Sequence, residues 1–395
     1  MAFGVVTLAT CLAVWLGARG PIASTGTHDL SPYPGSGLFG GWFRYDGRWY
    51  DIIATQGYSY NGPAAQSPVA FFPAYPLLLW ALHGLTGVSV RLLGTLATIA
   101  CGAAVVVLFR RWCGDRTDRT TAMVAVVTLL LYPYCYYLMG SLYADGLFLV
   151  ATLAAFVLLE RGHPVAAGLA GVVATASRPV GVAVVVGLVA VTLWRNGTIS
   201  RVGRRLRVDR STLHLRDSGV LLSLGGLIGW MTYLGIRFGN PLAFQEVQQA
   251  PGWDQGEGPS TWFKVKWWSE MWSLPRWSHR WLTTGDDEAF SRSLYAVGIL
   301  LQGLLVLAFV ALAWRVWKRL GWGYGVYSFA LVAIPLVSTK DFQGAGRYLL
   351  AAFPCYLVLA ELLVRRPLLR GAAWCAGGAL LLAWAFAFGR GYYVS

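Results

Sequence analysis

Long apolar stretches recur along this 395-residue chain, and they constrain its fold more than any other feature. Most run for roughly 17 to 22 residues, enough for an α-helix to cross a ~30 Å hydrocarbon core. Within a bilayer, only helices and closed barrels pair all of their backbone N–H and C=O groups. The alternating segments of about ten residues that a barrel needs are not found in the sequence. We therefore expect an all-α polytopic membrane protein, in keeping with 56% hydrophobic and 13% charged residues.

The apolar stretches predict about eleven transmembrane helices, with a range of roughly nine to twelve. The predicted spans are 1–18, 90–109, 120–139, 142–159, 164–176, 179–194, 218–237, 293–314, 322–338, 346–364 and 372–388. Since no soluble domain interrupts them, residues 1–395 are expected to form one membrane domain. Two prolines break the apolar pattern of residues 71–87, where Trp80 and His83 favour a helix at the membrane interface.

Basic residues in the short loops between the spans predict the topology. The basic loops are 110–119, 195–216, 315–319 and 365–370. Cytoplasmic loops carry an excess of Lys and Arg, so we expect a cytoplasmic N-terminus and an outer position for the segments 19–89 and 238–291. The net charge of +14 then reflects topology and does not indicate a nucleic-acid partner. Arg is far more abundant than Lys, and Ala, Val, Gly and Leu are frequent, which favours a bacterial plasma membrane.

The first outer segment carries the most conspicuous polar chemistry. Residues 42–76 read WFRYDGRWYDIIATQGYSYNGPAAQSPVAFFPAYP, with acids, guanidinium groups and aromatic rings between two apolar stretches. A polar region held at the membrane surface is where a lipid-linked substrate would meet reactive groups. Asp46 is the first candidate for a general base, and Asp51 is the competing candidate, on another face if the stretch is helical. In the alternative, both acids are structural and either cap a helix or pair with Arg44 and Arg48.

Three cations near the outer ends of later spans are candidates for binding a phosphate. Arg178 lies in ATASRPVGV, where a charge between two apolar runs is costly unless it is paired or faces a polar cavity. We expect it either to contact a phosphate or to pair with Asp145. Arg347 begins a span on the outer side, shortly after Lys340. These two cations either embrace a phosphate or extend to the interface, as basic side chains at helix ends commonly do.

The second outer segment, 238–291, is rich in tryptophan. Residues 250–285 mix many Trp residues with Lys and Arg, a composition typical of the lipid headgroup layer. This pattern predicts either a helix that rests on the membrane or a lid over a lipid substrate. Upstream, Gln245 and Glu246 belong to an amide-rich patch that suits sugar hydroxyls or a hydrated loop. The acidic run 286–288 predicts a solvated turn, and no spacing indicates a metal site or a cofactor.

Six segments, taken together and in order, resemble the PIG-V-type mannosyltransferases of the GPI mannosyltransferase 2 group and their bacterial relatives. The segments are RYDGRWYDIIATQGY (44–58), FFPAYPLLL (71–79), SLYADGLFLV (141–150), SRPVGV (177–182), NPLAFQEVQQAPGW (240–253) and GRYLLAAFPCYLVLAEL (346–362). They extend over most of the chain. The family usually has Trp-Asp where this chain has Tyr45-Asp46, and often has Glu at the position of Asp145.

The resemblance implies a GT-C-type integral membrane glycosyltransferase that takes mannose from a polyprenyl-phosphate donor on the outer face. It implies that Asp46 is the catalytic base. On the evidence of the residues themselves, Arg178, Arg347 and Lys340 are expected to serve the donor phosphate. Arg48, Asp51, Asp145, Gln245 and Glu246 are expected to bind substrate. In-line attack with a single base would invert the anomeric centre, so a β-linked donor would give an α-mannoside, and nothing in the sequence requires a cofactor or metal. The expected partners are the donor lipid, membrane lipids and an acceptor that is a glycolipid, a polysaccharide or a protein.

Two alternatives to this function are a transferase for another polyprenyl-phosphate sugar and a transporter or flippase of lipid-linked sugars. A transporter is expected to place ionisable groups near the bilayer midplane, along a path between the two faces. The polar residues of this chain are instead concentrated in the outer segments. This distribution favours an enzyme.

Overall fold

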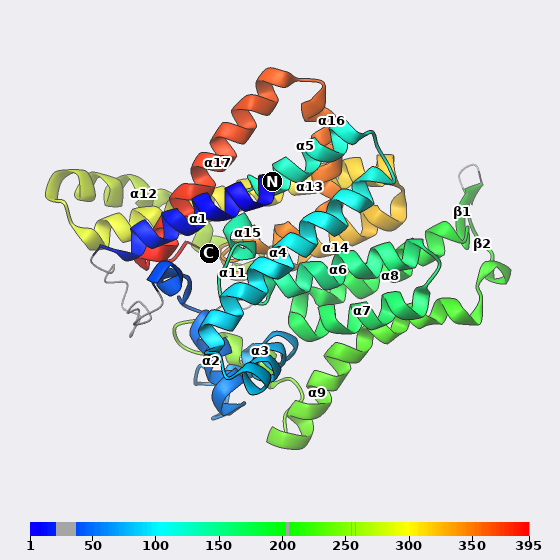
Figure 1. Cartoon of the computed structure of the whole chain (residues 1–395), viewed down its shortest axis with the longest axis horizontal. Helices are drawn as coiled ribbons and strands as arrows, with labels where there is room; N and C mark the ends of the chain where they lie inside the picture. The colour runs from blue at the N-terminus through cyan, green and yellow to red at the C-terminus, as the bar shows by residue number, and fades with distance from the viewer. Residues whose placement is uncertain (21–36, 203–204, 254, 257, 395) are drawn as a thin grey trace.

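The protein is helical almost throughout, as the apolar pattern predicts (Figure 1). The structure, a computed structural model, describes residues 1–20, 37–202, 205–253, 255, 256 and 258–394. Part of the predicted outer segment 19–89, residues 21–36, therefore lies outside the described residues. One antiparallel pair of short strands, β1 (Ile199–Val202) and β2 (Arg205–Val208), pairs Ile199 with Val208 in the basic loop after α8.

The helices follow the predicted spans closely. In the N-terminal half they are α1 (Ala2–Ala18), η1 (Gly37–Trp42), α2 (Gly47–Gln56), η2 (Pro68–Ala70), α3 (Ala74–Thr86), α4 (Val90–Gly114), α5 (Arg119–Leu130), η3 (Cys135–Leu138), α6 (Asp145–Glu160), α7 (Pro164–Ser177), η4 (Pro179–Gly181) and α8 (Val182–Arg195). In the C-terminal half they are η5 (Arg210–Thr212), η6 (Leu215–Leu224), α9 (Gly225–Phe238), α10 (Ala243–Glu246), η7 (Val247–Gln249), α11 (Gly258–Trp262), α12 (Val265–Thr284), α13 (Asp287–Leu320), α14 (Trp322–Ser338), α15 (Ala345–Tyr348), η8 (Leu349–Ala351), α16 (Phe353–Val364) and α17 (Pro367–Arg390).

Several of these helices have the length and composition of membrane spans. Among the described residues, α4, the continuous stretch Leu215–Phe238, α13 and α17 are each long and apolar enough to cross a membrane. A bent helix pair, Ala345–Ala351 with Phe353–Val364, makes a fifth candidate. The other apolar helices, such as α1, α7 and α14, have 10 to 17 residues. The chain is an integral membrane protein.

Two predicted spans differ from the helices in the structure, one in length and one in straightness, and a proline accounts for each difference. The span predicted at 120–139 ends as helix at Leu130, because Pro133 lacks an N–H and disfavours helical backbone at the residue before it. The span predicted at 346–364 bends by 82° between η8 and α16. Pro354 lies in the first turn of α16, where it begins a new helix but cannot continue the preceding one.

The proline-containing segment before α4 forms a separate helix, as expected. It folds into α3, whose residue Trp80 is exposed, and Gly87 ends the helix in a left-handed conformation before α4 begins. The position of α3 at the membrane interface remains a prediction. Helix packing then builds the bundle: α1 lies along α17, α6 along α7, α8 along α14, and α13 against both α12 and α14.

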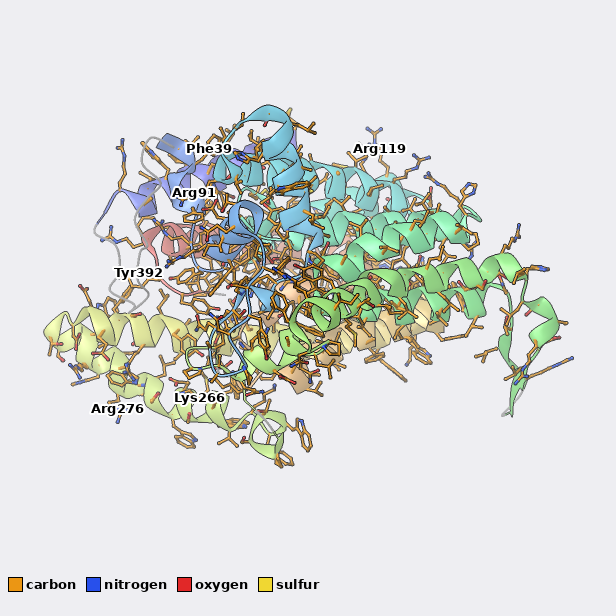
Figure 2. All side chains as sticks on the ribbon, turned by 90° about the horizontal axis from the view of Figure 1, so that it is seen from below. Phe39, Arg91, Arg119, Lys266, Arg276 and Tyr392 are labelled. Carbon is orange, nitrogen blue, oxygen red and sulfur yellow. The ribbon has the colours of Figure 1, made fainter. Side chains whose placement is uncertain are left out.

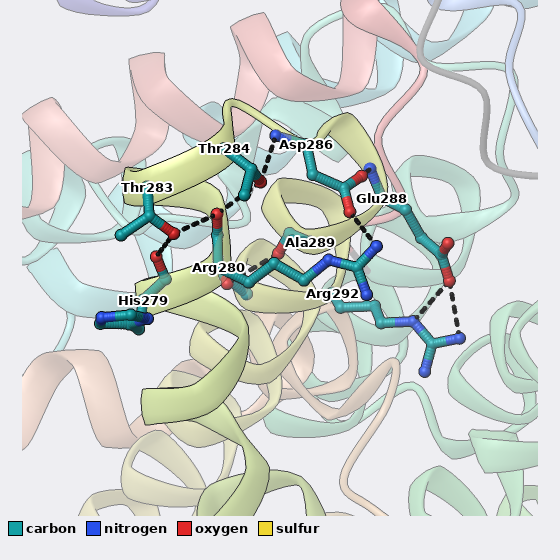
Figure 3. Close-up of polar contacts among 9 residues, drawn as sticks. His279, Arg280, Thr283, Thr284, Asp286, Glu288, Ala289 and Arg292 are labelled. Atoms are coloured by element: carbon teal, nitrogen blue, oxygen red, sulfur yellow. Dashed lines mark hydrogen bonds and ion pairs between the residues drawn. The ribbon is translucent and has the colours of Figure 1, made fainter.

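The Trp-rich segment forms a helical hairpin with α13 at one end of the molecule, opposite the β1–β2 end (Figure 1). Lys266 and Arg276 lie on the outward side of α12, at the edge of the protein (Figure 2). Side chains in the turn of the hairpin pair with one another (Figure 3). Asp286 caps α13 by accepting from the Glu288 N–H at 2.9 Å and pairs with Arg280 at 2.5 Å. The predicted solvated turn at 286–288 is thus confirmed only at its start, since Asp286 caps α13 and Asp287 and Glu288 form part of its first turn.

Candidate active site

Asp46 lies at a strained position between η1 and α2. Tyr45, the residue before it, has φ of 50°, a left-handed backbone conformation that residues other than Gly rarely adopt. Asp46 occupies the N-cap of α2, yet its carboxylate makes no capping hydrogen bond. Its backbone N–H instead donates to Tyr143 Oη at 3.2 Å. The carboxylate is therefore directed away from its own helix. Strain of this kind, costing about 1–3 kcal/mol, is concentrated at functional sites.

Arg347 is the partner of Asp46. Its Nη1 lies 2.9 Å from Asp46 Oδ2, and the Arg347 and Asp46 side chains are 11% and 22% exposed. The guanidinium also lies over the rings of Tyr137 and Tyr143, with 5.5 and 5.3 Å from Cζ to the ring centroids. Arg347 Nε is buried and has no hydrogen-bond partner among the described residues. A buried N–H without a partner is costly, so this atom is available to a ligand oxygen.

The loop that carries Asp46 is held by the far end of the chain. Arg44 is buried and donates from Nε and Nη2 to the Gly389 carbonyl, at 3.3 and 2.8 Å. Tyr45 Oη donates to the Gly391 carbonyl, and the Tyr45 ring meets the Tyr393 ring edge-on at 4.8 Å. These contacts stabilise the strained Tyr45 conformation. They could not be predicted from the sequence, because the two segments are 345 positions apart.

A second buried ion pair joins Arg178 Nη1 to Asp145 Oδ1. Pro179 ends α7 just after Arg178, whose backbone is extended, and Asp145 begins α6, where the helix dipole favours an acid. The Arg178 guanidinium also lies 4.7 Å from the centroid of the Tyr348 ring. Of the two roles expected for Arg178, the structure contains the ion pair with Asp145. Contact with a phosphate remains a prediction.

These groups surround a cavity of about 1320 Å³. Of the predicted site residues, Asp46, Arg48, Arg178, Arg347 and Gln245 line it. The structure thus brings together in one cavity residues from the first outer segment, the α7–α8 turn, the second outer segment and the start of α15. A cavity with a few charged groups among aromatic and aliphatic walls is typical of a substrate site.

The remaining predicted site residues lie outside the cavity lining. Asp51 pairs with Arg91, with 3.1 Å between Oδ2 and Nε, so its carboxylate is engaged on another face of α2. Glu246 accepts from Asn240 Nδ2 at 2.7 Å in an exposed position. Asp145 reaches the cavity through its partner Arg178, and Lys340 lies next to Gly256, a cavity-lining residue.

The alternative in which both acids pair with Arg44 and Arg48 is wrong for the described residues. Asp46 pairs with Arg347, which is brought to it by the fold, and Asp51 pairs with Arg91 at the start of α4. Arg44 is instead committed to the carbonyl of Gly389. Arg48 lines the cavity.

One wall of the cavity is aromatic and was not predicted from the sequence. Trp49, Phe71 and Trp253 pack against one another, with ring centroids 5.7 to 5.9 Å apart. Beside them lie several amide side chains, from Gln66, Gln245, Gln248, Gln249 and Gln255. Exposed ring faces and neutral amides together suit sugars, whose C–H groups meet the rings and whose hydroxyls pair with the amides. The amide-rich sequence after position 244 was the available signal for half of this wall.

Among the described residues, no cluster of three or more His, Cys, Asp or Glu side chains has the geometry of a metal site. A second, smaller cavity of about 460 Å³ lies elsewhere, lined by Arg116, Arg195 and Arg319. These arginines come from three of the loops predicted to be basic. The arginines are occupied structurally: Arg116 pairs with Glu160, Arg319 with Glu361, and Arg195 donates to backbone carbonyls.

Comparisons with known proteins yield similarity to solved structures alone. No family model matches the chain, and no curated protein matches it. The oligosaccharyltransferase of Archaeoglobus fulgidus, tethered to an acceptor peptide, is similar over 100% of this chain and 55% of its own, with 13% identity and a TM-score of 0.48. ArnT from Cupriavidus metallidurans, bound to undecaprenyl phosphate, is similar over 92% of this chain and 60% of its own, with 16% identity and a TM-score of 0.48. The chain thus spans little more than half the length of these proteins.

Proposed function

We propose that this protein is a glycosyltransferase that moves mannose from a polyprenyl-phosphate donor to an acceptor hydroxyl. The observation that carries the proposal is the Asp46–Arg347 pair in the wall of a large cavity. The pair supplies the two groups that such a transfer needs, a base for the acceptor hydroxyl and a cation for the departing phosphate. The resemblance of six ordered segments to PIG-V-type mannosyltransferases supports the choice of mannose and the GT-C class.

In the proposed reaction, the acceptor oxygen attacks the anomeric carbon as the bond from that carbon to the phosphate oxygen breaks. Asp46 takes the proton of the acceptor hydroxyl, and the negative charge remains on the polyprenyl phosphate. Arg347 holds that phosphate through its unpartnered Nε, and Arg178, which also lines the cavity, adds positive charge. Attack opposite the leaving group inverts the sugar, so a β-linked donor gives an α-mannoside.

The cavity walls divide the binding roles. The charged groups of the lining include Asp46, Arg178 and Arg347, where the phosphate and the reacting carbon belong. The wall of Trp49, Phe71 and Trp253, with its neighbouring amides, suits the hydroxyls and ring faces of sugars. The acceptor is a glycolipid, a polysaccharide or a protein.

We further propose a bacterial plasma membrane location, with the cavity on the outer face and the N-terminus in the cytoplasm. Support comes from the smaller cavity, because its arginines bring three basic loops to one place in the molecule. Basic loops that share one end of a bundle fit the cytoplasmic side. The Asp46 cavity is built from the segments that this topology assigns to the outside.

The test is transfer by the purified protein in liposomes. The membranes contain radiolabelled β-mannosyl phosphopolyprenol and pooled membrane glycolipids. We expect label to appear in a glycolipid product, and we expect α-mannosidase to release the labelled mannose from it. Movement of intact donor between leaflets, with no bond broken, would instead identify a transporter. Transfer from another polyprenyl-phosphate sugar but not from the mannosyl donor would keep the reaction class and reject mannose.

A further inference from the structure

Asp341 is a buried acid with no part in the proposed chemistry. It is fully buried and lies in the segment 339–347, which supplies Thr339, Gln343 and Arg347 to the cavity lining. Its Oδ2 accepts from Tyr295 Oη at 2.6 Å, and its Oδ1 accepts from the Gln343 N–H at 3.1 Å. A buried carboxylate is retained only where its hydrogen bonds are made, so the local structure is built around this group.

Tyr295 belongs to α13, and the same helix contacts the segment 339–347 at a second point. Gln302 of α13 is 1% exposed, and its side-chain oxygen accepts from the Gly346 N–H at 2.9 Å. The Gly346 carbonyl accepts from Tyr132 Oη, also at 2.9 Å. Tyr295 and Gln302 lie two turns apart and therefore on one face of α13. Helix α13 thus holds the segment at Asp341, through Tyr295, and at Gly346, the residue before Arg347, through Gln302.

The turn between these points is strained. Phe342 has φ of 66°, one of the few non-Gly residues with positive φ in the described chain. Lys264, which also has positive φ, donates from Nζ to the carbonyls of Pro335 and Thr339 and so secures the start of the turn. Backbone in such conformations persists only where surrounding contacts impose it. The contacts here come from Asp341, Lys264 and α13.

We propose that Tyr295, Asp341 and Gln302 are positioning residues that hold Arg347 against Asp46. Arg347 follows directly after Gly346, so the clamp on Gly346 fixes where the guanidinium begins. Loss of the clamp lets Arg347 leave Asp46 and the position where a phosphate oxygen binds. The catalytic role of Arg347 rests on the proposed function. The positioning of Arg347 by these residues does not depend on that function.

The experiment compares Tyr295→Phe and Gln302→Leu with Tyr324→Phe. Tyr324 also donates a buried hydroxyl to a carboxylate, that of Glu160, but it lines the smaller cavity. Phenylglyoxal modification of each arginine is followed by peptide mass spectrometry in the intact, reconstituted protein. We expect Arg347 to react faster with phenylglyoxal in Tyr295→Phe and in Gln302→Leu than in the unmodified protein. In Tyr324→Phe the reactivity of Arg347 should equal that of the unmodified protein. Unchanged reactivity of Arg347 in folded Tyr295→Phe would overturn the proposal.

Kinetics supply the second readout. Misplacement of a catalytic group by about 1 Å costs on the order of 100-fold in rate, so Tyr295→Phe should lower kcat/KM for the donor by about 10- to 100-fold. In an Arg347→Gln background the same change should have no further effect, because the network acts through Arg347. Equal losses in both backgrounds would show a merely structural role. If the unmodified protein transfers no sugar, the proposed function fails, while Arg347 reactivity still decides the positioning role.

Discussion

Asp46 and Arg347 are 301 positions apart in the sequence, and their side chains meet at 2.9 Å. The acid precedes α2 in the first outer segment, and the cation lies in α15, where a bent helix pair begins. Each is held independently, Asp46 through the contacts of Arg44 and Tyr45 with the end of α17, and Arg347 through α13. Several strained or buried polar residues therefore serve to position one ion pair.

Arg347→Lys tests whether the fork of the guanidinium matters as well as its charge. Lysine keeps the charge but loses the paired N–H groups that suit a carboxylate and a phosphate together. We expect kcat/KM for the donor to fall by about 10- to 100-fold. Arg91→Lys is the matched control, because Arg91 pairs with Asp51 outside the cavity. Similar losses in both variants would argue against a special role for Arg347.

The Arg178–Asp145 pair should behave as a buried ion pair. Removing one partner leaves an unpaired buried charge, so Arg178→Leu or Asp145→Leu alone should cost about 3–5 kcal/mol of stability. The double variant should be more stable than either single variant. Thermal unfolding in detergent measures all three. The exposed pair Arg292–Glu288 is the control, since loss of a surface pair costs at most about 1 kcal/mol. Additive losses at Arg178 and Asp145 would contradict coupling.

Lys264 should give stability a distinctive pH dependence. Burial lowers the pKa of Lys264 from 10.5 to about 8, while the unfolded chain keeps the ordinary value. Above about pH 8 the unfolded state therefore binds more protons at this residue than the folded state, so raising the pH favours folding. The neutral amine still donates to both carbonyls. We expect unfolding temperatures of the unmodified protein, relative to Lys264→Met, to rise between about pH 8 and 10.5 and to stay level below. A fall over that interval would contradict this account.

The exposed face of α12 should lie in the lipid headgroup layer. Val265, Trp268, Trp272 and Leu282 share one face of the helix, and each is exposed. Lipids brominated near the headgroup should quench Trp272, so Trp272→Phe should reduce the quenched share of the fluorescence. Trp230→Phe is the control, because Trp230 is buried and its Nε1 has no hydrogen-bond partner in the part of the chain that the structure describes. Equal quenching before and after Trp272→Phe would place α12 away from the lipid.

The sequence predicted the helices well because bilayer-length apolar runs leave few alternatives. Errors arose where prolines interrupt apolar runs, at Pro133 and Pro354, because hydrophobicity alone does not register a missing N–H. The contact of Gln302 was predictable in kind from the sequence. Gln302 is an isolated polar side chain within an apolar stretch of α13, and such residues usually make specific contacts.

The candidate site was predictable residue by residue but not as a geometry. Asp46, Arg178 and Arg347 stood out as charges near apolar stretches, and Asp145 was foreseen as a possible partner of Arg178. The pairing of Asp46 with Arg347, and of Asp51 with Arg91, depends on helix packing across long sequence separations. The aromatic wall was hidden for the same reason, since Trp49, Phe71 and Trp253 come from three separate segments.

The central claim is that Asp46 is the base, and the most direct measurement is turnover of Asp46→Asn beside Asp51→Asn. Both variants exchange a carboxylate for an amide of the same shape in the first outer segment, and thermal unfolding confirms that each is folded. Loss of a general base costs about 10²- to 10⁴-fold, so Asp46→Asn should lose turnover on that scale, with Asp51→Asn within a few-fold of the unmodified protein. Near-normal turnover of folded Asp46→Asn would contradict the account.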